Sequence, residues 1–511
     1  MPSTNEFDVV IVGSGAAGAT LAARLSEDPS VRVLLLEAGG PADRPEIRDP
    51  GGFVSLWGSD VDWALATEPQ AGLGGRELVI NQGRVLGGST ALNAMMFVRG
   101  SPLNYDQWNA LGADGWSYQE VLPVFKALED YQGGASDVRG AGGPIPVVDC
   151  PDDVMRSEAF MRATAEAGFG TPYLDTNGAV QDGAAGLLQF HIAGDGQRAS
   201  AASIFLDPHA ERSNLVVRSG AQVTRVIVEG GRAVGVVYQQ AGETQVVHAA
   251  REVAIAAGAL QTPKLLMLSG IGPAAELRAH GLEVVIDQPG VGANLQDHVQ
   301  LPVVFKRRSE APHTTLLTGN VLFFRTRDGA EAAAPDMQLN FTPSIPGPLA
   351  PMLGLPFAAC IFLPILVQPF SRGRVSLRSS DPFAPPRIDP AYLSVDADMQ
   401  AFRRALTVIR EIAATPAFRE LNEAEILPGP DADVDPFIRS NASSLWHPAG
   451  TARMGQDATA VVDPHLRVRG VEGLRVVDAS VMPTVPSGNT VAPAFMIGWR
   501  AADFMQRSWA G

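Results

Sequence analysis

Cysteine is almost absent from this chain of 511 residues, which has only Cys150 and Cys360. Neither stands in a C-x-x-C pair or beside a histidine, so the sequence offers no metal-binding motif and we expect no metal. Two distant thiols in a chain of this size are typical of a reducing compartment, where both stay free. A disulfide between them is the alternative.

Long apolar runs and net positive charge are also missing. No segment reaches the ~18 consecutive apolar residues that a membrane-spanning helix needs. The first expected strand begins at about Phe7, which leaves no room for the apolar core of a signal peptide. We therefore expect a cytoplasmic protein. The formal charge of −16 argues against nucleic acid or an anionic membrane as the main partner.

What the sequence does contain is typical of a large globular protein. Hydrophobic residues make up 46% of it and charged residues only 18%. A chain of 511 residues is too long for one compact core, so we expect two domains.

The opening residues carry the most informative pattern. Residues 7–12 are apolar and β-branched, as in a buried strand, and residues 16–25 are mostly small and suit a helix lying close on a sheet. Between them, Gly13 suits a sharp turn and Gly15 a close approach of the backbone to a pyrophosphate, while Gly18 allows tight packing of helix on strand. The free N–H groups at the start of the helix would face the phosphates.

A second strand is expected at 31–36, and Glu37 follows it directly. A carboxylate at this place binds the ribose hydroxyls of an adenosine. A glycine-rich turn alone is weak evidence, but the strand, helix, second strand and terminal acid together predict a dinucleotide-binding site.

Four further motifs lie along the chain. They are a second glycine-rich loop entering a helix at 83–95, a helix bounded by proline and glycine at 258–273, the hexapeptide Trp-His-Pro-Ala-Gly-Thr at 446–451, and Ser-Gly-Asn-Thr at 487–490.

The glycine-rich and β-branched stretches recur between less regular, proline-rich ones, which indicates an α/β protein with one domain inserted into the other in more than one piece. Short strands are expected at 216–218, 223–228, 233–238, 252–258 and 473–478, and an amphipathic helix at 397–414. We expect the nucleotide-binding domain in residues 1–145, 205–304 and 455–511, and the second domain in residues 146–204 and 305–454.

With these five motifs in this order, the chain resembles the glucose–methanol–choline (GMC) family of FAD oxidoreductases over about its whole length. Within the family it is most similar to the bacterial branch of choline dehydrogenases and of hydroxymethylfurfural or aryl-alcohol oxidases. Segments 106–108, 112–116 and 290–298 support that placement. The resemblance implies an α/β fold in which a Rossmann-like FAD-binding domain carries an inserted α+β substrate-binding domain.

The resemblance also implies which residues hold FAD. The ADP half is expected against the first motif, the pyrophosphate and isoalloxazine along the second glycine loop, the adenine at one backbone position, and the ribityl region near the C-terminus. These residues are, in that order, Gly13, Gly15, Ala16, Gly18, Glu37 and Ala38; Gly87, Gly88 and Asn93; Val223; and Asp478, Ala479 and Thr490. Some family members attach FAD through a histidine of the second loop; Leu92 stands at the matching position here, so non-covalent FAD is expected.

For catalysis, His447 and Asn489 match the family's paired residues. A histidine whose pKa is near neutrality suits removal of a hydroxyl proton while hydride leaves the carbinol carbon. An amide such as Asn489 hydrogen-bonds the same oxygen without competing for the proton. Trp446 is expected either in the substrate pocket or in the core, whereas His298, His313 and His465 are expected to be structural.

The activity that the resemblance implies is oxidation of a primary alcohol, aryl or furanic, to an aldehyde by hydride transfer to flavin N5, with His447 as base and oxygen as acceptor. A choline-type dehydrogenase with another electron acceptor is the first alternative. A flavin-containing lyase or photodecarboxylase on the same scaffold is the second, and a flavin-binding protein without activity is the third. The sequence identifies neither the alcohol nor the oligomeric state.

Overall fold

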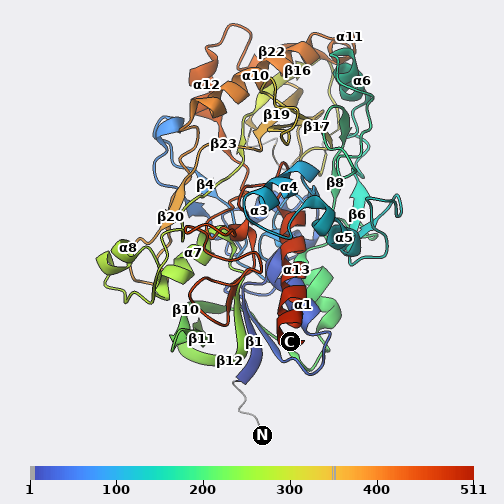
Figure 1. Cartoon of the computed structure of the whole chain (residues 1–511). Helices are drawn as coiled ribbons and strands as arrows, with labels where there is room; N and C mark the ends of the chain where they lie inside the picture. The colour runs from blue at the N-terminus through green and yellow to red at the C-terminus, as the bar shows by residue number, and fades with distance from the viewer. Residues whose placement is uncertain (1–5, 313, 348, 350–352, 511) are drawn as a thin grey trace.

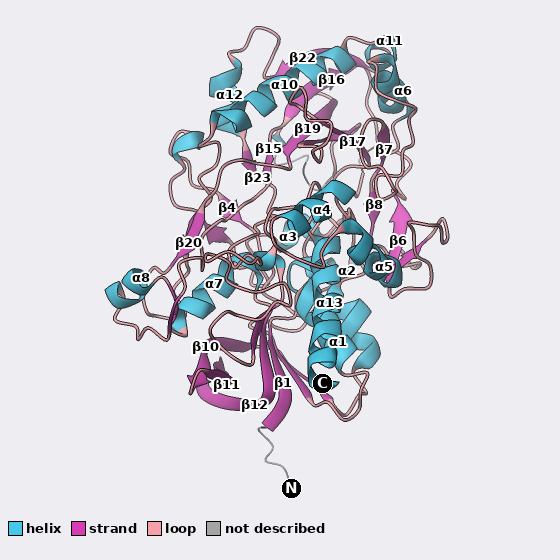
Figure 2. Cartoon of the chain, in the orientation of Figure 1, coloured by secondary structure: helices cyan, strands magenta, loops and turns pink. Residues whose placement is uncertain are grey.

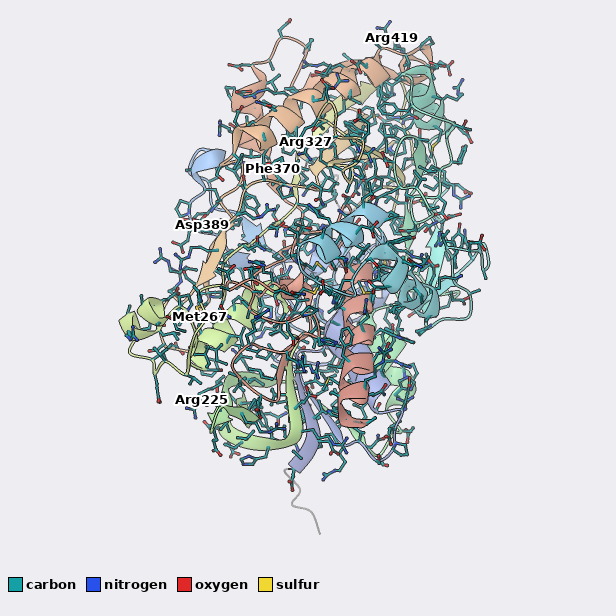
Figure 3. All side chains as sticks on the ribbon, viewed as in Figure 1. Arg225, Met267, Arg327, Phe370, Asp389 and Arg419 are labelled. Carbon is teal, nitrogen blue, oxygen red and sulfur yellow. The ribbon has the colours of Figure 1, made fainter. Side chains whose placement is uncertain are left out.

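The computed structural model describes residues 6–312, 314–347, 349 and 353–510. Two β-sheets, each with its own helices, lie at opposite ends of an elongated molecule (Figures 1 and 2). Arg225 lies in the lower half of the view and Arg419 at the top (Figure 3). The cores of the two halves are separate hydrophobic clusters.

The lower half is built on a seven-stranded sheet with the order β10-β11-β12-β1-β2-β9, in which β24 also pairs with β12. Strand β1 (Glu6–Val12) is parallel to both neighbours, β2 and β12, and its buried apolar residues occupy the centre of the sheet. The others are β2 (Val33–Leu36), β9 (Leu215–Arg218), β10 (Ala221–Glu229), β11 (Arg232–Gln240), β12 (Glu243–Ile255) and β24 (Leu474–Val476).

Helices α1 (Ala16–Leu25) and α13 (Val491–Ala510) lie side by side against this sheet (Figure 1). Their backbones approach closely at Gly498, where an added Cβ would stand 2.3 Å from the carbonyl oxygen of Ala17. Arg24 on α1 also pairs with Asp503 on α13 at 3.1 Å. Helix α7 (Gly258–Leu268) follows β12. The first and last helices of the chain thus form one layer.

The upper half contains an eight-stranded sheet with the order β22-β16-β19-β18-β17-β7, which β15 and β23 join through β19. Its strands are β7 (Ala185–Leu187), β15 (Val299–Gln300), β16 (Val303–Arg307), β17 (Asn320–Phe324), β18 (Met337–Thr342), β19 (Ala359–Leu366), β22 (Asn422–Leu427) and β23 (Ser443–Ser444).

Alternation along β18 divides this sheet into two faces. Met337, Leu339 and Phe341 belong to one hydrophobic cluster with the buried side of α10 (Asp396–Ala413). Gln338 and Asn340 therefore face the other way, toward the lower half. Helices α6 (Glu158–Glu166), α11 (Pro416–Arg419) and α12 (Val434–Asn441) complete the upper layer.

The remaining elements are short. They are α2 (Pro45–Arg48), α3 (Phe53–Leu56), β3 (Leu65–Ala66), η1 (Ala71–Leu73), β4 (Val79–Ile80), η2 (Gly88–Ala91), α4 (Pro102–Ala110), α5 (Tyr118–Leu128), β5 (Glu129–Tyr131), β6 (Ile145–Asp149), β8 (Gln189–Phe190), η3 (Ala202–Leu206), η4 (Asp207–His209), β13 (Ile271–Gly272), α8 (Ala274–Ala279), β14 (Ile286–Asp287), β20 (Arg374–Ser376), β21 (Arg387–Asp389) and η5 (Ala479–Val481).

The α/β fold expected from the sequence is present. Two local expectations were wrong. The second glycine loop enters the 3₁₀ turn η2 and not an α-helix, because Gly87 and Gly88 both have positive φ angles of 90° and 54°. The helix expected over 258–273 ends at Leu268, since Gly270 has a φ of 80°, and Pro263 lies in its interior and not near its first turn. Strand β15 already belongs to the eight-stranded sheet and lies a few residues before residue 304, after which the change of domain was expected. The domain boundaries stay a prediction. Among the described residues, no helix is long and apolar enough to cross a membrane.

Candidate active site

One long cavity runs between the two halves and is lined by segments from almost the whole chain. Glu37 and Val223 line it where the lower sheet ends, and His447 and Asn489 line it where loops meet the upper half. The two glycine-rich loops meet in between, since a Cβ added to Gly88 would stand 2.8 Å from the Cα of Gly15.

The first glycine motif has the form that a pyrophosphate requires. Gly15 is the N-cap of α1, no side chain caps that helix, and its first turn has no acidic residue. A Cβ added to Gly15 would meet no described atom within 4 Å, so the missing side chain leaves open space beside free N–H groups. These groups favour a bound anion.

Two buried acids line the cavity, and each is held by backbone donors. Glu37 accepts hydrogen bonds from Ser14 (2.7 and 3.0 Å) and from Gly39 (2.8 Å). Asp478 accepts from the N–H of Gly258 (2.9 Å) and from the hydroxyl of Thr262 (2.6 Å). Burial raises the pKa of both carboxyl groups. The open backbone at Gly15 and the carboxylate of Glu37 fit the two phosphates and the adenosine ribose of FAD.

The structure places most of the expected FAD residues on this cavity. Gly18 and Gly87 do not line it. A Cβ at Gly18 would stand 2.0 Å from the oxygen of Gly13, which is the tight packing the sequence predicted, and the N–H of Gly87 donates to Ser14 at 3.1 Å. Those on the cavity are Gly13, Gly15, Ala16, Glu37, Ala38, Gly88, Asn93, Val223, Asp478, Ala479 and Thr490.

In the second glycine loop, Asn93 is held by a buried cation. Its Oδ1 accepts from Arg198 at 2.8 Å, and its Nδ2 lies 3.3 Å from Nε2 of His191. Burial lowers the pKa of Arg198 to about 9. Leu92 also lines the cavity, and His447 is the only histidine among the described lining residues, which include no cysteine or tyrosine.

The loop that carries His447 is pinned by the segment that precedes β15. Leu445 donates to the carbonyl of His298 at 2.8 Å, and the N–H of His447 donates to Asp297 at 2.7 Å. Asp297 also accepts from the hydroxyls of Ser444 (2.5 Å) and Tyr392. Trp446 itself has a φ of 61°, a left-handed conformation that these bonds hold in place.

The orientation of the Asn489 amide assigns the tautomer of His447. With this amide as it stands in the structure, its Nδ2 donates to Nε2 of His447 at 3.3 Å, which places the lone pair on Nε2. The proton is therefore on Nδ1, which donates to Nδ1 of His298 at 2.9 Å. Burial lowers the pKa of His447 to about 3, and burial together with His447 holds the pKa of His298 well below its usual value. At neutral pH His447 is therefore unprotonated, and its pKa lies well below the near-neutral value expected from the sequence because burial disfavours the charged ring.

The upper sheet and the His447 loop form a mainly apolar wall around this end of the cavity, contributed by Leu317, Leu363, Leu445 and Trp446. Asn340 of β18 is the polar residue that this sheet adds. Among the described lining residues the acids are Glu37 and Asp478, which belong to the dinucleotide-binding part.

Sequence reasoning gave Asp297 no individual role and expected His298 to be structural, and the structure places both in contact with His447. Both lie in the segment 290–298, and their closeness to His447 arises from chain pairing over about 150 positions. The unusual run Asp-His in that motif was the available signal. His465 lies exposed outside the cavity, and His313 lies outside the described residues.

Known proteins match this chain over most of its length. The N- and C-terminal models of the GMC oxidoreductases match residues 7–300 and 369–498. An oxygen-dependent choline dehydrogenase from Brucella anthropi is 40% identical over 98% of this chain and 95% of its own. A pyridoxine 4-oxidase structure from Mesorbium loti superposes with a TM-score of 0.91 at 35% identity, covering 99% of both chains. A fungal aryl-alcohol oxidase structure gives a TM-score of 0.88 at 26% identity over 99% of this chain and 100% of its own.

Proposed function

The chain belongs to the GMC oxidoreductase family, and from this premise we propose that it oxidises a primary alcohol, aryl or furanic, to the aldehyde. As a GMC enzyme it is an FAD-dependent oxidoreductase that acts on CH–OH groups. We propose that the FAD is bound without a covalent link. The absence of cysteine, tyrosine and any histidine but His447 from the described cavity lining supports this.

The observation that carries the proposal is the unprotonated Nε2 of His447, paired with an amide, at the end of a cavity built for a dinucleotide. An alcohol that displaces the amide from Nε2 can donate its hydroxyl hydrogen there, and Nδ2 of Asn489 can then donate to the alcohol oxygen. His447 takes the proton and Asn489 holds the oxygen.

FAD, when bound, supplies the hydride acceptor at N5. The protein supplies the electrostatics around it: α13 begins at Val491 in the cavity wall, and its N-terminal N–H groups favour negative charge nearby. Oδ1 of Asn489 is buried without a partner among the described residues, so this amide keeps hydrogen-bonding capacity for a ligand.

The pocket suits a neutral alcohol better than a quaternary ammonium. Recognition of such a cation requires a carboxylate or several aromatic faces directed at one point. Asp297 is already bonded to the loop, Trp57 and Trp446 pack on each other with ring centres 4.8 Å apart, and Arg84 covers the ring of Trp63 at 4.8 Å.

Choline is the second candidate substrate, because a relative 40% identical is named for it. For the acceptor we propose molecular oxygen, which the names of the choline dehydrogenase and the two oxidases support. The overall reaction is then alcohol plus oxygen to aldehyde plus hydrogen peroxide.

Product analysis tests the proposal. The purified holoprotein is incubated in air, in the dark, with benzyl alcohol, 5-hydroxymethylfurfural or choline, and aldehyde and hydrogen peroxide are quantified. We expect equal amounts of both products from an aryl or furanic alcohol. Oxidation of choline alone would favour the second candidate, aldehyde without peroxide would exclude oxygen as acceptor, and no aldehyde from any alcohol would favour the lyase or photodecarboxylase.

A further inference from the structure

Asn340 is an isolated polar group in the apolar wall of the substrate end. It lies in the middle of the upper sheet, opposite Val321 on β17 and Leu363 on β19, and it is 1% exposed. Burying an amide in such a place is unfavourable unless its donors and acceptors are satisfied. Because Asn340 lines the cavity, a ligand in the cavity can satisfy the amide groups that the protein leaves unpaired.

Only the oxygen of the Asn340 amide has a hydrogen-bond partner among the described residues. Its Oδ1 accepts a hydrogen bond from Nε2 of Gln338 at 2.9 Å, from the same face of β18 two residues earlier. Its Nδ2 donates to no residue that the structure describes. With the two amides oriented as in the structure, this contact leaves the two N–H groups of Asn340 for the cavity, while Oε1 of the fully buried Gln338 has no partner among the described residues.

From this arrangement we infer that Asn340 is a specificity-determining residue that donates a hydrogen bond to a neutral acceptor on the substrate, separate from the hydroxyl that meets His447. This inference rests on the proposed function and narrows its substrate class. The preferred alcohols are flat, apolar molecules that carry a carbonyl or ring-nitrogen acceptor away from the carbinol carbon. Donor hydrogens facing the cavity also disfavour a quaternary ammonium, which has no acceptor to offer.

A matched pair of substrates isolates this contact. Furfuryl alcohol and 5-hydroxymethylfurfural share the ring and the carbinol, and only the second carries a formyl acceptor. Asn340→Leu keeps the size of the side chain and removes the donor. Thr342→Val is the control, because Thr342 lies on the same face of β18, two residues later and outside the cavity lining.

We expect Asn340→Leu to lower kcat/KM for 5-hydroxymethylfurfural about tenfold, because one hydrogen bond to the formyl group is lost. The kcat/KM for furfuryl alcohol should change less than twofold. Intrinsic differences between the two alcohols cancel, because each variant is compared with the wild type on the same substrate. Thr342→Val should leave both values unchanged.

An equal loss for both alcohols, or no loss for either, would overturn the role of Asn340 while leaving alcohol oxidation intact. If Asn340→Leu does not fold, Asn340→Ala is measured in the same way. If the wild-type protein oxidises neither alcohol, the proposed function itself fails, and the inference with it.

Discussion

At His447 the position of a single proton decides what the residue can do. Asn489 donates to Nε2 and His298 accepts from Nδ1, so the lone pair lies on the nitrogen that lines the cavity. The fixed tautomer is the residue-scale basis of the proposed chemistry. Two predictions follow from it.

The first prediction concerns removal of the base. His447→Gln keeps a polar side chain but cannot take a proton, so the rate constant for flavin reduction by the alcohol should fall a hundredfold or more. FAD should stay bound, because its expected contacts lie elsewhere. Rapid mixing without oxygen measures the rate. His465→Gln, an exposed histidine outside the cavity, is the matched control, and a fall of less than tenfold in His447→Gln would exclude His447 as base.

The second prediction concerns pH. The base works in its unprotonated form, and burial lowers the pKa of His447 from 6.5 to about 3. Lowering the pH through 6.5 therefore leaves His447 neutral, and the rate constant for flavin reduction at pH 6 should lie within about twofold of that at pH 9. The rate constant is measured across this range, with enzyme stability checked at each pH. A rate constant that falls at low pH with an inflection near 6.5 would contradict the lowered pKa of His447.

At the scale of elements, regular patterns with short-range causes were predictable. The strand expected at 7–12 is β1, and the helix expected at 397–414 is α10, whose bounds are Asp396–Ala413. Strand β12 was only partly found, because its first residues, from Glu243, are mostly polar and exposed, although they pair with β11. The contacts of His447 with Asp297 and His298 could not be predicted, since they depend on how distant segments pair.

The third prediction contrasts two glycines of one motif. Gly15 has a φ of −64°, which alanine accepts, and an added Cβ would meet open cavity. Gly15→Ala should therefore fold normally but retain less than half of the wild-type FAD. Gly18→Ala places a Cβ 2.0 Å from the oxygen of Gly13 and should lower the Tm of the FAD-free protein, as overpacking does.

FAD content per chain and the Tm of the FAD-free protein separate these effects. Full FAD occupancy in Gly15→Ala would contradict the expected path of the pyrophosphate. An unchanged Tm in Gly18→Ala would contradict the close packing of α1 on the first glycine turn.

At the scale of the whole molecule, the cavity connects the two halves of the chain. Residues of the lower half, such as Gly15 and Asp478, and residues of the upper half, such as Asn340 and Leu363, line the same space. The sequence indicated the dinucleotide-binding part through compact motifs. It could not indicate the substrate wall, which is assembled from alternate residues of separate strands.

The fourth prediction is that a non-covalently bound FAD stabilises the whole fold. Acid precipitation should release all of the flavin into the supernatant. The FAD-free protein should have a Tm several degrees lower, and added FAD should restore it, because a ligand present at a hundred times its Kd contributes about 2.7 kcal/mol. Flavin that stays in the precipitate would show a covalent link.

The central claim is that this cavity oxidises an aryl or furanic alcohol, and flavin reduction without oxygen tests it most directly. The holoprotein is mixed in the dark with 5-hydroxymethylfurfural, and then with the same alcohol deuterated at the carbinol carbon, while flavin absorbance is followed. We predict rapid bleaching that is several times slower with deuterium, because the C–H bond breaks in the step observed. A flavin that stays oxidised with this alcohol and with benzyl alcohol would contradict the claim.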